Sequence, residues 1–427
     1  MLNEDRAILI GICENSRSFA LKESSLDELG RLADTAGVEV VGRFIQNRQA
    51  PDKTFYAGKG FLADGLKEMT DKDAGLLIFD NELSPSQGRN IEKKFEISVT
   101  DRTEVILNIF HNHARTREAK LQVRLAELQY QLPRLKRLWS HLDREKGQAS
   151  GSGGASRGMG EKQIEVDKRL IRLEISIVKR ELRKVFLQKE VQRKQRERVK
   201  KVCLVGYTNA GKSTIFNRLT DAGVLVEDKL FATLETTTRK LVLSKGRDMI
   251  LSDTVGFISN LPHHLVASFR ATLKDVVDAD LLLHVVDAAD DEQVRYLEEV
   301  NKVLQQIEAG DIDQIIVFNK IDIADRTRLK FLMEAEDDSA AVSAVTGENM
   351  DAFLQQIDNK LHRAKEWHLL IPHSKQRVIN HLHELGQILE KDYLDEGVKI
   401  SAVINQEDMQ EFEQFVIKDP TKIKKAK

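Results

Sequence analysis

The sequence is poor in cysteine and has no long apolar runs. Its two cysteines, Cys13 and Cys203, each lie inside a short apolar run, with no second cysteine nearby in the sequence. This spacing argues against structural disulfides and thiolate zinc sites, and it is typical of a reducing cytosol. No apolar run approaches the roughly 18 to 20 residues of a membrane-spanning helix, and the first residues, MLNEDRAILIGIC, are acidic where a signal peptide would be basic. We therefore expect a cytoplasmic protein without a membrane span.

An excess of charge of one sign is also missing. The 427 residues include 66 lysines and arginines against 68 aspartates and glutamates, a formal net charge of -2. The overall charge therefore does not indicate a nucleic-acid partner, and any basic surface must be local. A strongly basic segment runs from Lys179 to Lys201. Two interpretations of it stay open: a solvated helix face, and a surface that contacts an anionic partner.

The chain length allows two to four domains, and the apolar pattern indicates where the first one lies. From Ala7 to about Phe110, short apolar runs alternate with helical stretches, which predicts a parallel α/β domain over residues 1–112. In this domain, Ser84 and Pro85 are typical of a helix start. The turn Gly58-Lys59-Gly60 could meet a phosphate, but we favour an ordinary strand-to-helix turn.

The next region, residues 113–198, has heptad spacing in two stretches. The apolar positions that carry it are Leu121, Leu125, Leu128, Leu132, Leu135, Trp139 and Leu142, and then Ile164, Ile171, Ile175, Val178, Leu182 and Val185. This spacing predicts an antiparallel two-helix coiled-coil hairpin, with helices of about 25 residues and a Gly-rich tip loop at 147–160. Pro133 lies inside the first helix and should kink or divide it.

Alternating strands and helices return over residues 199–365, which predicts a second α/β domain, and the phosphate and guanine motifs described next make it a P-loop GTPase domain. Residues 366–427 should form a small α+β C-terminal domain, with a helix near Lys375–Glu390 and a strand near Val398–Ile404. The fold class is thus multidomain α/β.

A phosphate-binding loop lies in the segment VCLVGYTNAGKST, a buried strand followed by G-x-x-x-x-G-K-S. In this motif the glycines let backbone N–H groups surround the phosphates, Lys212 reaches the outer phosphates, and the Ser213 hydroxyl binds magnesium. The segment MILSDTVG then offers Asp253 at a strand end, where it can hold magnesium through water, and Gly256, whose amide can meet the γ-phosphate.

The choice of base is also predictable. In IIVFNKID, a strand delivers Asn319, Lys320 and Asp322 to a loop. The Asp322 carboxylate can accept hydrogen bonds from both the ring N–H and the exocyclic amine of guanine, a donor pair that adenine lacks. The segment VSAVTGEN adds Ser343 and Ala344, whose amides can meet the guanine oxygen.

The motifs arrive in the order and spacing of translation-factor-type GTPases, which this part of the sequence resembles. The resemblance implies that the segment LFATLETTTRK supplies a threonine that binds magnesium when the γ-phosphate is present. We choose Thr233, and the run of Thr236, Thr237 and Thr238 contains its rivals. The predicted catalytic residues are Lys212, Thr233 and Gly256, and the predicted metal ligands are Ser213, Thr233 and Asp253. The predicted nucleotide contacts are Gly206, Tyr207, Thr208, Asn209, Ala210, Gly211, Lys212, Ser213, Thr214, Phe231, Ala232, Thr233, Leu234, Asp253, Thr254, Val255, Gly256, Asn319, Lys320, Asp322, Ser343 and Ala344.

The hydrolytic step lacks one familiar residue. Where many GTPases carry a water-orienting glutamine, this chain has Phe257, so we expect slow intrinsic turnover that a partner accelerates. His263 and His264 are more typical of exposed or capping residues. Asn209 matches the asparagine that potassium-activated GTPases use to bind a monovalent cation, so we consider potassium beside magnesium as a cofactor, with GTP as the substrate.

Over the whole chain, the sequence resembles the HflX family of GTPases. The segments that carry this resemblance are YAGKG, IFDNELSPSQGRNIE, DRTEVILNIFHNHARTREAKLQVRLAEL, RGMGEKQIEVDKRLI, GYTNAGKSTIFN, LFATLETTTRK, DTVGFI and NKID. The resemblance implies GTP-dependent binding to the large ribosomal subunit and its RNA, with splitting of stalled or idle ribosomes, and we expect a monomer. Arg157, Lys162 and Arg169 are then predicted to face RNA.

Three alternatives stay open. A tRNA-modifying GTPase shares the phosphate loop, but such enzymes carry a C-terminal cysteine, and this chain has none after Cys203. A ribosome-assembly scaffold would use slow GTP hydrolysis to time its release. A second nucleotide activity, on ATP, could belong to the N-terminal domain.

Overall fold

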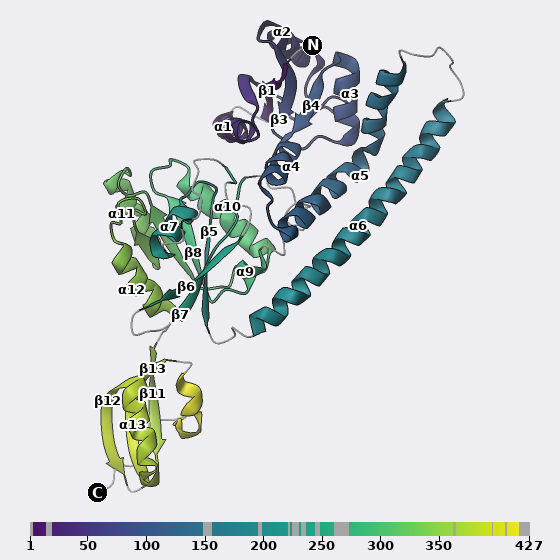
Figure 1. The fold of residues 1–427 in the computed structure, drawn as a ribbon. Helices are drawn as coiled ribbons and strands as arrows, with labels where there is room; N and C mark the ends of the chain where they lie inside the picture. The colour runs from purple at the N-terminus through teal and green to yellow at the C-terminus, as the bar shows by residue number, and fades with distance from the viewer. Residues whose placement is uncertain are drawn as a thin grey trace. The chain divides into compact units, whose positions relative to one another are not determined.

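The computed structural model forms two compact units, residues 1–241 with 248–348 and residues 242–247 with 349–427 (Figure 1). The residues that the structure describes are 3–13, 19–147, 156–194, 199–220, 223, 230–231, 236–243, 248–259, 273–361, 364–394, 396–405 and 408–417.

The first unit begins with a four-stranded parallel sheet in the order β2-β1-β3-β4. Its elements are β1 (Asn3–Cys13), α1 (Phe19–Thr35), β2 (Glu39–Asn47), α2 (Lys59–Asp71), β3 (Ala74–Phe79), α3 (Pro85–Phe95), β4 (Ser98–Asp101) and α4 (Arg102–His113). Alternate residues of β1 face opposite layers. Ala7 and Leu9 pack with α1 and α4, whereas Ile8 and Ile10 pack with α2 and α3. Helices on both faces explain why β1 is apolar throughout its centre.

Local sequence signals set two helix starts in this sheet domain. Ser84 caps α3 in a capping box with Gln87, and Pro85 occupies the first turn. Gly58 caps α2, and its amide donates to Gln46 Oε1 at 2.8 Å. Gly58-Lys59-Gly60 therefore forms the start of α2.

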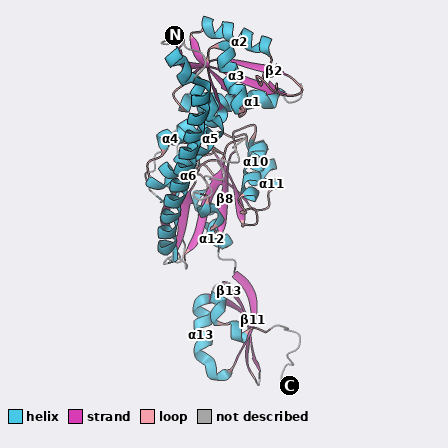
Figure 2. Ribbon diagram, turned by 90° about the vertical axis from the view of Figure 1, so that its right-hand side faces the viewer, coloured by secondary structure: helices cyan, strands magenta, loops and turns pink. Residues whose placement is uncertain are grey.

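Two long helices follow, α5 (Arg117–Gly147) and α6 (Ser156–Lys194), and they lie side by side (Figure 2). Leu125 and Leu128 of α5 pack with Val178 and Leu182 of α6. The helices have 31 and 39 residues, so the predicted length of about 25 was too short. The predicted loop at 147–160 was too long, because α6 already begins at Ser156. Pro133 lies within α5 and does not divide it.

The GTPase part of the first unit contains a six-stranded sheet in the order β10-β9-β8-β5-β7-β6. The strands from β10 to β7 pair in parallel. The elements are β5 (Lys200–Gly206), α7 (Lys212–Thr220), β6 (Thr237–Val242), β7 (Asp248–Asp253), α9 (Lys274–Val277), β8 (Leu281–Asp287), α10 (Gln293–Gln306), β9 (Gln314–Asn319), α11 (Arg326–Ala335) and β10 (Ser339–Ala341).

The second unit holds a three-stranded antiparallel sheet in the order β11-β13-β12. Its elements are α12 (Met350–Leu361), β11 (Ala364–Ile371), α13 (Gln376–Leu385), β12 (Gly386–Leu394) and β13 (Gly397–Asn405), with short 3-10 turns at His373–Lys375, Asp408–Glu411 and Glu413–Phe415. The helix predicted near Lys375–Glu390 was therefore too long. Residues from Gly386 onward pair with β13 instead.

Candidate nucleotide-binding site

The loop between β5 and α7 needs glycine at two positions. Gly206 has φ 146°, and an added Cβ would lie 2.2 Å from the Val285 carbonyl oxygen. Gly211 has φ 92°, and an added Cβ would lie 2.1 Å from Asn319 Nδ2. Both the positive φ and the close approach exclude any larger residue. The loop therefore curls tightly at the carboxyl end of the sheet, where parallel α/β sheets bind their ligands.

Lys212 begins α7 and its ammonium turns back into this loop. Its Nζ donates to the carbonyl oxygens of Gly206 at 3.1 Å and Tyr207 at 2.6 Å. Burial lowers the pKa of Lys212 from 10.5 to about 8, against the opposing effect of Asp253. Among the described residues, the Lys212 ammonium donates hydrogen bonds to carbonyl oxygens only. A buried cation of this kind is well suited to bind an anion such as a phosphate.

Ser213 and Asp253 meet across the loop. The Ser213 hydroxyl donates to Asp253 Oδ2 at 2.6 Å. The other carboxylate oxygen, Oδ1, is buried and has no hydrogen-bond partner among the described residues. Burial raises the pKa of Asp253, opposed by the Ser213 hydrogen bond and by Lys212. A hydroxyl beside a buried carboxylate with a vacant oxygen is a donor set that suits a hydrated magnesium ion.

Gly256 and Phe257 lie directly against the loop. An added Cβ on Gly256 would be 2.7 Å from Thr208 Cγ2 and 3.0 Å from Lys212 Nζ. The Phe257 amide donates to the Gly206 carbonyl oxygen at 3.1 Å, and the Thr208 amide donates to the Phe257 carbonyl oxygen at 2.8 Å. The segment after β7 is thus fastened to the phosphate loop. The Phe257 side chain is buried in the core, only 4% exposed.

Hydrogen bonds bring together the residues predicted to contact the base and connect them to the phosphate loop. Asn319 Nδ2 donates to the Ala210 carbonyl oxygen at 3.0 Å, and Asn319 Oδ1 accepts from the Ala344 amide at 3.1 Å. The Ser343 hydroxyl donates to Asp322 Oδ1 at 2.6 Å. Asn319 therefore joins the phosphate loop to the loop after β10, and it aligns these two parts of the site.

A salt bridge fixes the position of Lys320. This residue has φ 64° and its Nζ lies 2.7 Å from Asp287 Oδ2. Thr254, another predicted contact, turns its hydroxyl to the Leu204 carbonyl oxygen at 2.7 Å, so its side chain supports β5. Only its backbone can face a nucleotide.

Some predicted residues lie outside the described part of the chain. These are Ala232, Thr233 and Leu234, together with His263 and His264. Phe231, next to them, is buried, and its ring meets Phe110 of α4 with centroids 4.7 Å apart. Thr237 and Thr238, rivals of Thr233, lie in β6.

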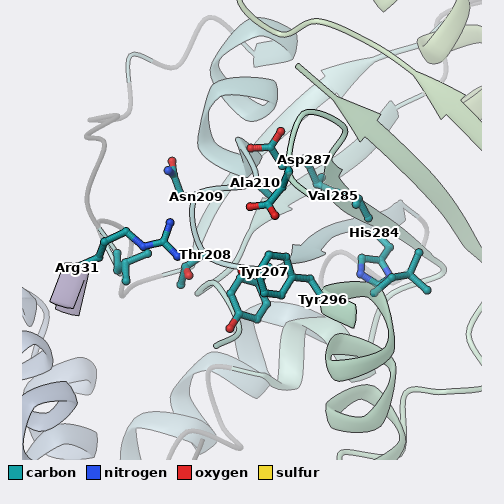
Figure 3. A pocket seen from close by; sticks show the side chains of 13 residues that line it. Arg31, Tyr207, Thr208, Asn209, Ala210, His284, Val285, Asp287 and Tyr296 are labelled. Carbon is teal, nitrogen blue, oxygen red and sulfur yellow. The ribbon is translucent and has the colours of Figure 1, made fainter. Parts of the chain in front are cut away.

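A small pocket of about 40 Å³ lies beside the phosphate loop (Figure 3). It is lined by Thr208 and Asn209 of the loop, by His284 of β8, by Tyr296 of α10 and by Arg31 of α1. The Arg31 guanidinium points toward Thr208 and Asn209. Sequence reasoning missed Arg31, because an exposed arginine on an amphipathic helix gives no local signal.

Two buried polar atoms in the wall of this pocket lack partners among the described residues, Thr208 Oγ1 and His284 Nδ1. Burial lowers the pKa of His284 from 6.5 to about 4, with a further contribution from Lys212. The imidazole is therefore neutral at physiological pH. Elsewhere, no helix among the described residues is long and apolar enough to cross a membrane.

Comparisons with known proteins cover nearly the whole chain. Family models match in sequence: GTP-binding GTPase N-terminal at residues 23–111, GTP-binding GTPase Middle Region at 113–196, 50S ribosome-binding GTPase at 201–320 and HflX C-terminal domain at 329–425. The chain is 39% identical to the GTPase HflX of Caldanaerobacter subterraneus, over 97% of this chain and 94% of that one. It is 43% identical to the GTPase HflX of Magnetococcus marinus, over 90% and 89%, and 40% identical to that of Escherichia coli, over 89% of each. The loop has the geometry of a GTPase phosphate site, and the similarity to these proteins extends along almost the full length of the chain. The chain therefore belongs to the HflX family of GTPases.

Proposed function

We propose that this GTPase binds the large ribosomal subunit in its GTP form and splits stalled or idle ribosomes. The observation that carries the proposal is the family match, which includes a model described as a 50S ribosome-binding GTPase over the nucleotide site. The two long helices support it, because α6 has 39 residues and would extend for about 58 Å. Such an extension suits a protein that probes a deep cavity. A ribosomal partner would place the protein in the cytoplasm.

In this proposal the phosphate loop residues from Gly206 to Thr214 hold the phosphates of GTP. Lys212 neutralises charge on the outer phosphates, and the Gly256 amide donates to the γ-phosphate. Ser213 and Asp253 hold magnesium, together with Thr233, and the vacant Asp253 Oδ1 supports this assignment. When bound, magnesium neutralises charge that develops on the phosphate oxygens.

Hydrolysis needs an oriented water molecule as well as charge neutralisation. Phe257 cannot orient the water, because its ring is apolar and buried in the core. We therefore infer slow intrinsic turnover that rises when the protein binds the ribosome.

A monovalent cation is a further proposed component. Asn209 has φ 62° and lines the pocket beside the phosphate loop, where its side-chain oxygen suits a potassium ligand. Comparing GTP turnover in potassium chloride with turnover in sodium chloride tests this; equal rates would refute it.

Guanine selection is proposed for Asp322, with Lys320 along the base face and the amides of Ser343 and Ala344 at the guanine oxygen. The contacts of Asn319 support this arrangement, because they fix the loop after β10 relative to the phosphate loop.

Basic residues of α6 are proposed to contact ribosomal RNA. The exposed ones in the described part of α6 are Arg169, Arg172, Lys179, Arg180, Arg183 and Lys184. The side chains of Arg157 and Lys162, also predicted to face RNA, lie outside the described residues. Phosphate contacts of this kind make binding fall steeply with salt. Replacing Arg157, Lys162 and Arg169 together by alanine should weaken binding to the large subunit.

Sedimentation of intact ribosomes through a sucrose gradient tests the proposal. With the protein and a non-hydrolysable GTP analogue, we expect dissociation into subunits, with the protein on the large one. With GDP, we expect intact ribosomes. Binding without dissociation would favour an assembly scaffold, and no binding would refute a ribosomal role.

A further inference from the structure

The side chain of Tyr207 leaves the phosphate loop and is buried against the N-terminal domain. It is 6% exposed, and its ring stacks on Tyr296 with centroids 4.0 Å apart. Its hydroxyl donates to the Glu28 carboxylate of α1. The same oxygen accepts a hydrogen bond from the Ser259 amide at 2.6 Å and lies 2.6 Å from the Ser259 hydroxyl. Burial is the main cause that raises the pKa of Tyr207, and the nearby Glu28 carboxylate raises it further. The hydroxyl therefore keeps its proton.

A buried arginine holds Glu28 in place. Arg102 Nη1 donates to Glu28 Oε2 at 2.8 Å, and Arg102 Nη2 donates to Asp80 Oδ1 at 2.8 Å. Lys22 Nζ also binds Asp80, at 2.7 Å. Two cations thus balance two carboxylates, which satisfies the main condition for burying charge. Arg102 Nη1 further reaches the Ser259 carbonyl oxygen at 3.4 Å.

Ser259 is therefore held by the N-terminal domain through both Tyr207 and Arg102. Ser259 lies three residues after Gly256. Between them, the backbone amide and the carbonyl oxygen of Phe257 each form a hydrogen bond with the phosphate loop. The segment Gly256–Ser259 is fixed at one end by the loop and at the other end by the N-terminal domain. Tyr207 therefore connects the segment that contains Gly256 to Glu28 of the N-terminal domain.

We propose that Glu28 and Arg102 of the N-terminal domain are positioning residues for GTP hydrolysis. They act through Tyr207 and Ser259, and they hold the phosphate loop and the Gly256 amide in the geometry that the transition state requires. The inference rests on the proposed role of Gly256. It does not depend on the ribosome, and it extends the GTPase site to a domain that contributes no part of the phosphate loop.

Turnover of GTP by the full-length protein, without ribosomes, tests this inference. Tyr207→Phe removes one hydroxyl and keeps the ring stack, and Glu28→Gln keeps the shape of the side chain. Each is expected to lower kcat about tenfold, the range for loss of a hydrogen bond to a charged group, while KM for GTP and affinity for GDP stay within about twofold. The double variant should be slower by less than the product of the two single effects, because both changes weaken the hydrogen bond between Tyr207 and Glu28, whereas Tyr207→Phe also removes the bonds to Ser259.

Asp27→Asn is the matched control, because it makes the same change from carboxylate to amide on the same helix. Asp27 is exposed and pairs with Arg43 inside the N-terminal domain. We expect wild-type kcat for this variant. Wild-type kcat in Tyr207→Phe and Glu28→Gln would overturn the inference. So would a parallel loss of GDP affinity and of melting temperature in both, because that pattern indicates support of the fold alone. Failure of ribosome binding would refute the proposed function and leave this result unaffected.

Discussion

Ser343 donates a hydrogen bond to Asp322 Oδ1 across 2.6 Å and so orients the carboxylate proposed to bind guanine. Asp322→Asn replaces one acceptor oxygen by an NH₂ donor. The variant side chain then has one acceptor fewer for the N–H groups of guanine. Its new NH₂ group can instead donate to the second carbonyl oxygen of xanthine. We expect GTP affinity to fall about 100-fold and affinity for xanthosine triphosphate to rise, as measured by competition binding.

Ser343→Ala serves as the control for this exchange. It removes the orienting hydroxyl and leaves the carboxylate, so GTP affinity should fall by no more than about tenfold and the base preference should stay with guanine. An Asp322→Asn protein that still prefers GTP over xanthosine triphosphate would contradict the assignment of Asp322.

The pKa of Lys212 predicts how nucleotide binding depends on pH. Because burial lowers this pKa to about 8, the free protein loses the charge above pH 8, whereas a bound phosphate favours the charged form. Affinity for GDP should therefore fall about tenfold from pH 7 to pH 9, as measured by calorimetry. Lys212→Arg keeps its charge over this range, so its affinity should not decline, whatever its value at pH 7. An equal decline in both proteins would show that another group titrates.

His284 predicts a loss of stability in acid. Its folded pKa, about 4 because of burial and Lys212, lies below the ordinary 6.5. A depressed pKa contributes stability that is present above pH 6.5 and is lost as the pH falls toward 4. Urea unfolding should show a decrease of about 2 kcal/mol in the free energy of unfolding between pH 6.5 and 5. The variant His284→Gln, which does not titrate, should show a smaller decrease; an unchanged slope would argue against a buried neutral histidine.

Arg31 lies in α1 of the N-terminal domain and places a positive charge beside the phosphate loop. Arg31→Ala should weaken binding of GTP and GDP by about threefold to tenfold, more at low salt than at high salt. Arg31→Lys should retain most of the affinity. Arg89→Ala removes an arginine of α3 that does not line this pocket and should leave binding unchanged. Filter binding at two salt concentrations distinguishes these outcomes, and an Arg31→Ala protein with wild-type affinity would exclude the electrostatic role.

The phosphate and base motifs were predictable because each is local. Gly206, Gly211 and Lys212 follow one strand, and Asp253 and Asn319 each end another. Parallel strands bring their carboxyl ends to the same edge of a sheet, so motifs far apart in the chain meet there. The order of the strands was not needed to place these residues near one another.

The contacts of Tyr207 could not be predicted in this way. Glu28 and Arg102 are 179 and about 100 residues away from it, and no spacing rule connects an aromatic residue in a phosphate loop with a carboxylate on another domain. Only the packing of the N-terminal domain on the GTPase part brings them together. Arg31 was missed for the same reason.

Two differences from the sequence predictions depend on packing or pairing with another element. Pro133 was expected to kink or divide its helix, and it does not divide it, because α5 continues to Gly147. The cost of an internal proline, about 3 kcal/mol, is offset by packing of the apolar face of α5 against α6. The segment from Gly386 to Glu390 was predicted to continue the helix, yet it belongs to β12, which pairs with the next strand, β13. Hydrogen bonds to that neighbouring strand, and not the composition of the segment alone, determine its conformation.

The burial of both cysteines has a practical consequence. Cys13 in β1 and Cys203 in β5 are 2% and 1% exposed, and burial raises the pKa of the Cys203 thiol. Maleimide dyes and nitroxide spin labels react with accessible thiolates, so the native fold protects both positions. A cysteine introduced at exposed Glu165 of α6 would then accept a single label without prior removal of the natural thiols. The movement of the long helices on a ribosomal particle would become measurable by fluorescence.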